Sequence, residues 1–339
     1  MNAPHAAPPA LNRRILFHER PRGMPTASCF QLVTVPLARL GEGQVLVRNH
    51  LLSVDPYIRM RMEANDSYAP VMAIGDVMVG RTAGEVVESR ADGFRAGDWV
   101  VGRLGWQAYS VASPAELQPI DIKLAPPSAY LGALGSTGIT AWVGLMVIGQ
   151  PKAGETVLVS AASGAVGSVA GQLARNQGCR AVGIAGGPAK CAQVVEAYGF
   201  DDCIDYKSAD FADRLAVAVP DGVDVYFDNV GGPILDSVLP LMSNFGRIPL
   251  CGLVSQYNAT EPYGVRNLRE VFNRRITLRG FVLSDHKEHW PEATAALISA
   301  YIAGRLKYRE TISEGLENAP QAFIDMLNGA NFGKQLVRL

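Results

Sequence analysis

The sequence lacks the long apolar run that a membrane-spanning helix requires. No stretch approaches the ~20 consecutive apolar residues needed to cross a bilayer. The formal net charge of -1 gives no attraction for nucleic acid or an anionic membrane. The Ala/Pro/His-rich N-terminus has no basic segment followed by an apolar core, so it is not a signal peptide. We therefore expect a soluble, cytoplasmic protein, without nucleic acid or a membrane as partner, and a flexible N-terminus over residues 1–11.

Paired cysteines and clustered metal ligands are also lacking. The five cysteines stand singly, which is typical of a reducing compartment rather than a disulfide-bonded secreted protein. Structural zinc needs four clustered cysteines and catalytic zinc a Cys/His set, and neither is present. His286 and His289 have no third ligand near them in sequence, so we interpret them as surface residues and predict no metal. Without ligands for a Lewis acid, the sequence favours a substrate whose acceptor carbon is already electrophilic.

The pattern of apolar residues and turns changes along the chain. At 339 residues it exceeds the ~250–300 at which one core stops growing, so we expect two domains. Residues 13–130 alternate like short strands between Gly, Pro and Asp turns. From about 131, buried strands alternate with helices, which predicts a doubly wound parallel sheet over 131–304. The tail, 305–339, is expected to fold back on the β-rich domain, 12–130.

Six strand candidates carry the prediction of the parallel sheet. They lie at Thr156–Ser160, Ala181–Ala185, Cys203–Asp205, Val223–Asp228, Arg247–Cys251 and Ile276–Phe281. Helices are expected at about 165–177, 188–198, 208–218, 233–243, 264–274 and 288–303.

A glycine turn follows the first of these strands. A dinucleotide fold needs a tight turn here, so that the backbone and the helix N-terminus can approach the pyrophosphate. The segment Ala162-Ser-Gly164-Ala-Val-Gly167 has the required spacing, with Ala in place of the first glycine. By itself the match is weak, and a plain strand–helix turn is the alternative. Its position between a strand and a helix favours the dinucleotide interpretation.

The end of the second strand discriminates between cofactors. NAD sites usually place Asp or Glu about 20 residues on, where it binds the ribose 2′-hydroxyl. This chain has Ala185-Gly-Gly-Pro-Ala-Lys190 instead. No carboxylate repels a 2′-phosphate there, and Lys190 can pair with one. The alternative for Lys190 is a solvated lysine at a helix start. We predict NADPH as the cofactor.

The motifs together resemble the zinc-independent branch of the medium-chain dehydrogenase/reductase superfamily. Within it, the chain resembles prostaglandin/leukotriene reductases and plant alkenal reductases, and most of all bacterial NADPH-dependent curcumin reductases. The resemblance implies a GroES-like catalytic domain beside a Rossmann domain, and a homodimer. The segments that carry it are Leu52–Arg59, Ser163–Ser168, Ala185–Cys191, Val225–Gly232, Pro249–Ala259, Glu314–Pro320 and Asn331–Lys334.

The resemblance also implies roles for individual residues around the cofactor. The pyrophosphate would lie on Gly164, Ala165, Val166 and Gly167. Lys190 and Tyr206 would bind the 2′-phosphate end, and Asn229 would lie at a strand tip. The remaining cofactor residues implied are Thr140, Cys251, Gly252, Leu253, Val254, Tyr257, Phe281, Val282, Leu283 and Asn331. Taken alone, Tyr206 could be a strand-end aromatic, and Asn229 and Asn331 turn formers.

On the substrate side, the resemblance implies Tyr257 as the group that hydrogen-bonds the substrate carbonyl. Tyr57 and Tyr68 would line the cleft. Ser284 stands where prostaglandin reductases carry a second tyrosine, which argues against prostanoid specificity. The implied reaction is reduction of the carbon–carbon double bond of an α,β-unsaturated carbonyl: hydride reaches the β-carbon, charge develops on the carbonyl oxygen as an enolate, and the α-carbon is then protonated. A phenol with a pKa near ~10 stays protonated at neutral pH and can donate to that oxygen.

Two other functions remain open from the sequence. An NADPH:quinone oxidoreductase needs the same cofactor half and an open aromatic-lined cleft. A sensor or structural protein that binds NADPH without turnover is an alternative of another class.

Overall fold

The structure, a computed structural model, describes residues 9–64, 68 and 70–339. Most of the N-terminal segment predicted to be flexible, residues 1–11, therefore lies outside the described residues. The chain divides into two compact units. The first contains the described residues up to 131 together with 311–331 and 335–339. The second contains 132–310 and 332–334.

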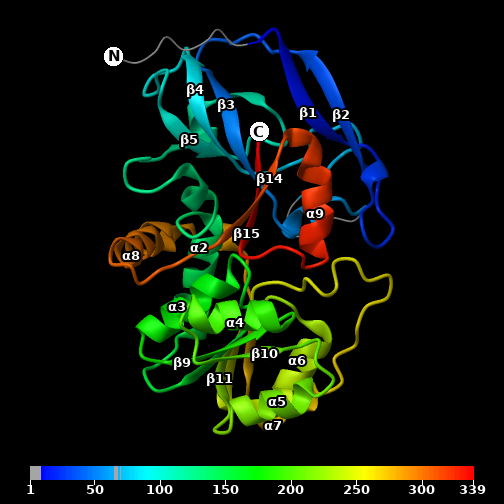
Figure 1. Ribbon diagram of the computed structural model, residues 1–339, viewed down its shortest axis with the longest axis vertical. Helices are drawn as coiled ribbons and strands as arrows, with labels where there is room; N and C mark the ends of the chain where they lie inside the picture. Colours follow the sequence, from blue (N-terminus) through cyan, green and yellow to red (C-terminus); the bar gives the residue numbers. More distant parts are fainter. Residues whose placement is uncertain (1–8, 65–67, 69) are drawn as a thin grey trace. The chain divides into compact units, whose positions relative to one another are not determined.

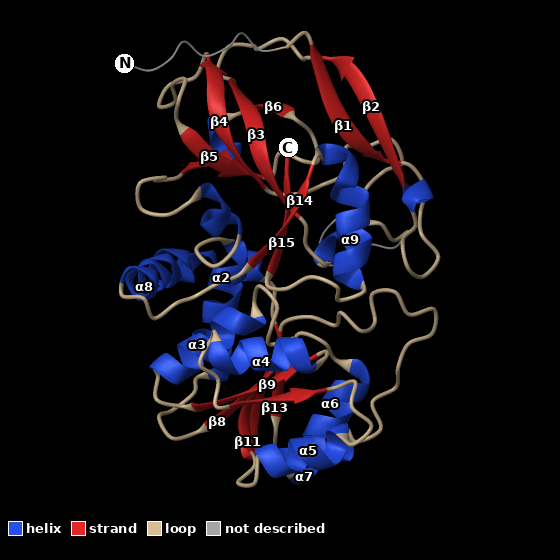
Figure 2. Cartoon of the chain, in the orientation of Figure 1, coloured by secondary structure: helices blue, strands red, loops and turns tan. Residues whose placement is uncertain are grey.

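The first unit is β-rich. β1 (Leu11–Phe17) pairs antiparallel with β2 (Phe30–Pro36). A seven-stranded sheet has the order β14-β15-β3-β4-β5-β7, with β6 paired to β3. Its strands are β3 (Val45–Ser53), β4 (Thr82–Ser89), β5 (Trp99–Gly102), β6 (Tyr109–Ala112), β7 (Leu117–Pro119), β14 (Glu310–Glu314) and β15 (Lys334–Arg338). Figure 2 shows β3, β4 and β5 side by side in red.

The first unit also contains short helices and 3-10 turns. They are α1 (Tyr57–Arg61), α9 (Ala319–Leu327) and the 3-10 turns η1 (Ala27–Cys29), η2 (Pro114–Glu116), η3 (Pro127–Leu131) and η7 (Leu316–Asn318). Phe323 of α9 meets the Trp106 ring edge-on with ring centroids 6.0 Å apart, and Trp106 stacks on Phe30 at 5.8 Å. All three side chains are buried, so the C-terminal helix completes an aromatic core begun near the N-terminus.

The second unit is a doubly wound parallel sheet with the order β10-β9-β8-β11-β12-β13 (Figure 1). Its strands are β8 (Thr156–Ser160), β9 (Arg180–Ala185), β10 (Asp202–Asp205), β11 (Val223–Phe227), β12 (Met242–Leu250) and β13 (Thr277–Gly280). All five residues of β8 are buried, as expected for a central parallel strand covered on both faces. The predicted fold class is confirmed, although β12 begins five residues before the predicted Arg247.

Helices connect the parallel strands and also follow the last of them, β13. They are α3 (Gly167–Asn176), α4 (Pro188–Glu196), α5 (Phe211–Ala218), α6 (Gly232–Val238), η5 (Leu239–Leu241), α7 (Arg269–Asn273), η6 (Leu283–His289) and α8 (Trp290–Ile302). α3 lies close on the sheet because Gly171 carries no side chain: a Cβ there would lie 1.8 Å from the Phe200 ring. No helix in the described part of the chain is long and apolar enough to cross a membrane.

In the second unit, the helical segment ahead of β8 was not predicted, and neither were α1 and α9 of the first unit. α2 (Ser136–Trp142) continues into a π-helix, η4 (Val143–Gly149), ahead of β8. Gly138 and Gly144 occur in it because neighbouring groups approach closely. A Cβ on Gly138 would lie 1.9 Å from the Ala133 oxygen, and one on Gly144 would lie 2.6 Å from the rings of Phe227 and Phe281. Glycines that suggest a loop in the sequence here permit tight packing.

The C-terminal part of the chain contributes to both units. Residues 305–310 and 332–334 group with the second unit, whereas 305–339 as a whole was expected with the β-rich domain. The backbone shows why: the Gly333 amide donates to the Ser163 oxygen at 3.0 Å, and the Lys334 amide to the Arg309 oxygen at 2.9 Å. The expected boundary at 304/305 stays a prediction.

Candidate functional site

The predicted cofactor residues of the second unit follow the carboxyl ends of its parallel strands. Counted from β8, the strand order is 3-2-1-4-5-6, and it reverses between β8 and β11. Ligands of such sheets bind at the carboxyl ends near the point of reversal. The glycine turn follows β8 and Asn229 follows β11, so both lie at this point.

The glycine turn is tightly built. Its first residue, Ala161, has a φ of 49°, in the left-handed region that favours glycine. The Gly164 amide donates to the Ala161 oxygen at 2.9 Å. A Cβ on Gly167 would lie 2.4 Å from that same oxygen, so glycine is required where α3 begins. The helix therefore starts close against the strand, with its N-terminus at the sheet edge where an anion is stabilised.

Lys190 and Tyr206 lie at one corner of this edge. Gly186 follows β9, and a Cβ on it would lie 2.9 Å from the Tyr206 ring. Asp205 fixes the corner, because its Oδ1 accepts from the Gly187 amide at 2.7 Å. Lys190 stands in the first turn of α4, with its amide donating to the Gly187 oxygen at 3.1 Å. The structure thus brings together two residues that the sequence separates by one strand and one helix.

Two lysines, Lys190 and Lys207, lie near the Asp205 carboxylate at this corner. Burial lowers the pKa of Lys190, and the nearby cation Lys207 lowers it further. The Lys190 ammonium lies 5.4 Å from the centroid of the Phe332 ring. An anion bound here would offset the repulsion between the two lysines. The corner is therefore suited to a phosphate.

Asp228, at the end of β11, is a residue that our interpretation of the sequence missed. Its side chain is fully buried, and Oδ1 accepts from the Tyr226 hydroxyl at 2.8 Å and the Ser160 hydroxyl at 3.0 Å. It also accepts from the amides of Val230 and Gly231. Burial raises the pKa of Asp228, although these hydrogen bonds oppose the rise. The signal in the sequence was an acidic residue directly after the buried run Val225-Tyr-Phe227.

Asn229 is held by the same strand ends. Its side-chain amide donates to the Ser160 backbone oxygen at 2.7 Å, and its backbone amide donates to the Ser160 hydroxyl at 2.9 Å. Asn229 thereby joins the ends of β8 and β11. Asn229 therefore lies at the strand tip, as predicted. Its contact with the cofactor stays a prediction.

Tyr257 lies in the segment that follows β12. The Leu253 amide donates to its hydroxyl at 3.4 Å, and a Cβ on Gly252 would lie 3.1 Å from that oxygen. The Cys251 amide donates to the Asp228 oxygen at 2.8 Å, so the segment starts beside Asp228. Burial raises the pKa of Cys251 to about 12, helped by the charge of Asp228, which keeps its thiol neutral. The Tyr257 phenol is thus directed to the sheet edge.

The same loop is anchored a second time by Asp236 of α6. Its carboxylate accepts from the Tyr263 hydroxyl at 2.8 Å and from the Asn267 amide at 2.7 Å. The Tyr263 amide in turn donates to the Gln256 side chain at 2.9 Å, next to Tyr257. These contacts fix the loop on both sides of the candidate donor.

Phe281–Leu283 and Thr140 complete the predicted residues of this unit. Phe281 packs edge-on against Phe227 with ring centroids 6.5 Å apart. The Leu283 oxygen accepts from the Trp290 indole at 3.2 Å. The Thr140 hydroxyl donates to the Ser136 oxygen within α2 at 2.8 Å. These contacts fix the Phe281 ring and the Leu283 backbone.

The remaining predicted residues are spread more widely. Tyr57 begins α1, and burial raises its pKa to about 12, as does Asp55. Tyr68 is exposed. Ser284 is exposed and donates to Asp285 at 3.3 Å. Asn331 is half-buried and directly precedes Phe332.

The interpretation of His286 and His289 as surface residues is corrected for His286. That side chain is buried, with its ring 6.3 Å from the Phe281 ring. Glu288, between them in sequence, was overlooked. Its Oε1 lies 4.0 Å from His286 Nδ1 and 3.7 Å from His289 Nε2. Among the described residues these three form the one group with metal-ligating potential.

Comparisons with known proteins agree with this geometry. A family described as the N-terminal domain of oxidoreductase matches residues 13–120, and one described as zinc-binding dehydrogenase matches residues 165–300. The sequence is 46% identical to the NADPH-dependent curcumin reductase of Escherichia coli (strain K12), over 97% of this chain and 97% of the relative. It is 40% identical to the NADP(+)-dependent 2-alkenal reductase of Nicotiana tabacum, over 96% and 97%.

A solved structure is similar over the same length. CurA from Vibrio vulnificus, in complex with NADPH, superposes with a TM-score of 0.92 at 44% identity and covers 96% of this chain and 98% of that one.

Proposed function

The chain belongs to the medium-chain dehydrogenase/reductase family, among the curcumin, alkenal and prostaglandin reductases, and we propose that it reduces the carbon–carbon double bond of α,β-unsaturated aldehydes and ketones with NADPH. The observation that carries the proposal is the corner at the ends of β9 and β10. There Lys207 lies near enough to Lys190 to lower its pKa, and the Tyr206 ring lies against Gly186, where NAD-specific sites place an acid.

The residues at the sheet edge fit the cofactor. Gly164–Gly167 would hold the pyrophosphate on the α3 N-terminus, and Lys190 and Tyr206 the 2′-phosphate. When bound, NADPH supplies the hydride that reaches the β-carbon. Other residues proposed around it are Thr140, Asn229, Cys251, Gly252, Leu253, Val254, Tyr257, Phe281, Val282, Leu283 and Asn331.

Tyr257 is the proposed donor to the substrate carbonyl oxygen. As negative charge develops on that oxygen, a phenol hydrogen bond stabilises it. Its support in the structure is a loop held at Asp228 and Asp236, so the hydroxyl needs little reorganisation. For the substrate side we propose Tyr57, Tyr68 and Ser284. The raised pKa of Tyr57 keeps its phenol protonated and able to donate.

We further propose a cytoplasmic homodimer, with the first unit as the catalytic domain. β13 is the last strand of the parallel sheet, with β12 as its strand neighbour among described residues. All four of its residues are exposed. A second copy could continue the sheet at this edge. The five free cysteines support a reducing compartment.

An NADPH-oxidation assay tests the reaction. We expect turnover with a 2-alkenal, an aliphatic enone and a curcumin-like dienone, and product analysis should find the carbonyl intact and the double bond saturated. A saturated aldehyde serves as the matched control and should give no turnover. Oxidation of NADPH by benzoquinone alone, with all three unsaturated carbonyls inert, would overturn the proposal in favour of a quinone reductase.

A further inference from the structure

Two cations flank the ring of Phe332. The Lys190 ammonium lies 5.4 Å from the ring centroid, and the Arg309 guanidinium carbon lies 4.8 Å from it. Both distances are within the range in which a cation is attracted to an aromatic ring. Phe332 therefore contacts the lysine that we assign to the 2′-phosphate.

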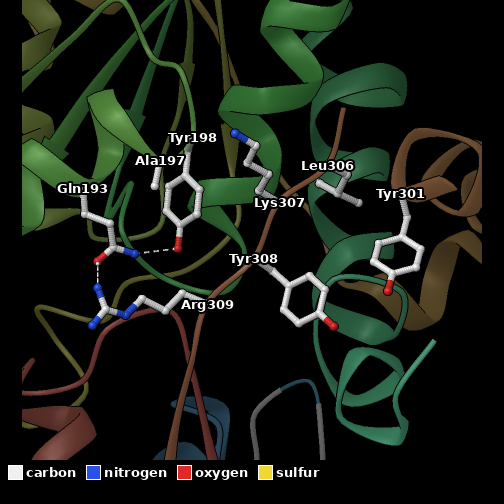
Figure 3. Close-up of a pocket in the computed structure, with 8 residues that line it drawn as sticks. All are labelled: Gln193, Ala197, Tyr198, Tyr301, Leu306, Lys307, Tyr308 and Arg309. Carbon is white, nitrogen blue, oxygen red and sulfur yellow. Dashed lines mark hydrogen bonds between the residues drawn. The ribbon is translucent and has the colours of Figure 1, made fainter. Parts of the chain in front are cut away.

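Arg309 is itself held by buried polar groups. Its guanidinium donates to the Gln193 side-chain oxygen at 3.3 Å, and the Gln193 amide donates to the Tyr198 hydroxyl at 2.7 Å (Figure 3). Gln193 and Tyr198 are both buried. These residues line one side of a groove of about 500 Å³. Arg309 is thus fixed by α4, the same helix that carries Lys190.

The backbone sets the position of Phe332 independently of its ring. The next residue, Gly333, forms a parallel bridge with Gly164 and donates to the Ser163 oxygen. A Cβ on Gly333 would lie 1.9 Å from the Arg309 oxygen, and its φ is 65°. Phe332 is therefore held between the nucleotide turn and the strand segment that carries Arg309.

The contact with Phe332 offsets part of the free-energy cost of fixing Lys190. A lysine side chain loses up to ~2 kcal/mol of rotamer entropy when it is fixed, and Lys207 repels it. An aromatic ring attracts the ammonium while leaving its N–H groups able to donate to a phosphate.

We propose that Phe332, fixed by Arg309, is a positioning residue that holds Lys190 toward the 2′-phosphate and so sets the preference for NADPH over NADH. The inference rests on the proposed role of Lys190. It adds that the cofactor preference depends on a ring more than 140 residues away in sequence, on a segment that crosses the nucleotide turn.

The test measures Kd for NADPH and NADH by fluorescence titration. Phe332→Leu keeps apolar volume but removes the ring, so we expect the Kd for NADPH to rise about fivefold while the Kd for NADH stays unchanged. Phe332→Tyr should bind like the wild type. Arg309→Gln should shift the preference in the same direction as Phe332→Leu. Thermal melting of each variant checks folding.

Lys307→Gln is the matched control for Arg309→Gln. It removes one positive charge from the same segment, and Figure 3 shows its side chain directed away from that of Arg309. Unchanged cofactor preference in this variant is expected. An equal shift in both variants would overturn the proposal, because general charge would then explain the effect.

A double-mutant cycle separates positioning from structural damage. In a Lys190→Ala background, Phe332→Leu should cause no further loss of NADPH affinity. If Phe332→Leu weakens NADPH and NADH equally, or if its effect persists without Lys190, Phe332 has a structural role and the proposal fails. If Lys190→Ala alone weakens both cofactors equally, the assignment of Lys190 to the 2′-phosphate fails first.

Discussion

Single residues at the carboxyl edge of the sheet differ in what their contacts allow them to do. Asp228 is buried under four hydrogen bonds to Oδ1, so it fixes backbone and hydroxyls rather than meeting a ligand. Tyr257 has a phenol with a weak 3.4 Å contact to a backbone amide. In this contact the phenol oxygen is the acceptor, so the contact does not use the O–H proton that Tyr257 would donate to a substrate oxygen. We therefore expect Tyr257 to take part in the reaction and Asp228 to hold the start of the segment that carries Tyr257.

Tyr257→Phe should lower kcat/KM for an enone about 100- to 1,000-fold, the loss typical of one donor to a developing oxyanion. The Kd for NADPH should change little, because the phenol is assigned to the substrate carbonyl. Steady-state kinetics with a 2-alkenal, together with a fluorescence titration of NADPH, measures both.

Tyr263→Phe is the control for this substitution. It removes a phenol from the same loop, but one bonded to Asp236. A comparable loss in both variants would mean that loop anchoring, and not donation by Tyr257, explains the effect. Unchanged turnover in Tyr257→Phe would remove the residue from the mechanism.

At the residue scale, the position of Lys190 after the second strand predicted its role, whereas Tyr206 was implied only by the resemblance to known reductases. The sequence could not indicate Phe332 or Arg309. Their contacts with Lys190 depend on the C-terminal segment returning to the nucleotide turn, and no local pattern encodes that return. The same is true of Asp228, whose role depends on hydroxyls and amides from two strand ends.

At the scale of elements, apolar runs bounded by turn residues located all six strands of the parallel sheet. The ends of the strands were less well predicted. β12 starts at Met242, five residues before the predicted Arg247, because its first residues precede the apolar run from which the strand was predicted. α2 and the π-helix were missed because helix propensity penalises glycine. Packing against Phe227 and Phe281 requires glycine there, and tertiary contacts decided the outcome.

The ion pair between Glu155 and Arg247 joins the start of β8 to β12. Burial by itself raises the pKa of Glu155, but hydrogen bonds from Arg247 and the Lys152 amide outweigh it, and the pKa is lowered from 4.5. The guanidinium also donates to the Gly149 and Gln150 oxygens at 3.0 Å. The pair therefore ties the π-helix to the sheet.

This pair predicts a pH dependence of stability. A carboxyl whose folded pKa is lowered adds stability above its unfolded pKa of 4.5, and that stability is lost as pH falls through the folded value. Melting curves of the wild type and Glu155→Gln between pH 7 and pH 3 should therefore converge at low pH. A constant difference in melting temperature across this range would contradict the assignment.

At the scale of the whole molecule, the exposed edge of β13 requires an explanation. Long-lived soluble proteins protect sheet edges with charge, bulges or a covering element. β13 is flanked by Arg275 and carries Arg279, but Leu278 between them is 39% exposed. Pairing with the same strand of a second copy would extend the sheet beyond β13 and cover this side chain. The edge is thus the expected dimer interface.

Leu278→Asp should weaken that dimer. In a two-fold interface each strand meets its own copy, so one substitution places two like charges near each other and costs about 1 kcal/mol or more. Light scattering after size exclusion should give twice 36.3 kDa for the wild type and a mass that falls on dilution for the variant. Val217→Asp, at an 80% exposed position on α5, controls for added charge and should stay dimeric. A wild-type protein with a mass of 36.3 kDa at all concentrations would exclude the dimer, and an unaffected Leu278→Asp dimer would place its interface elsewhere.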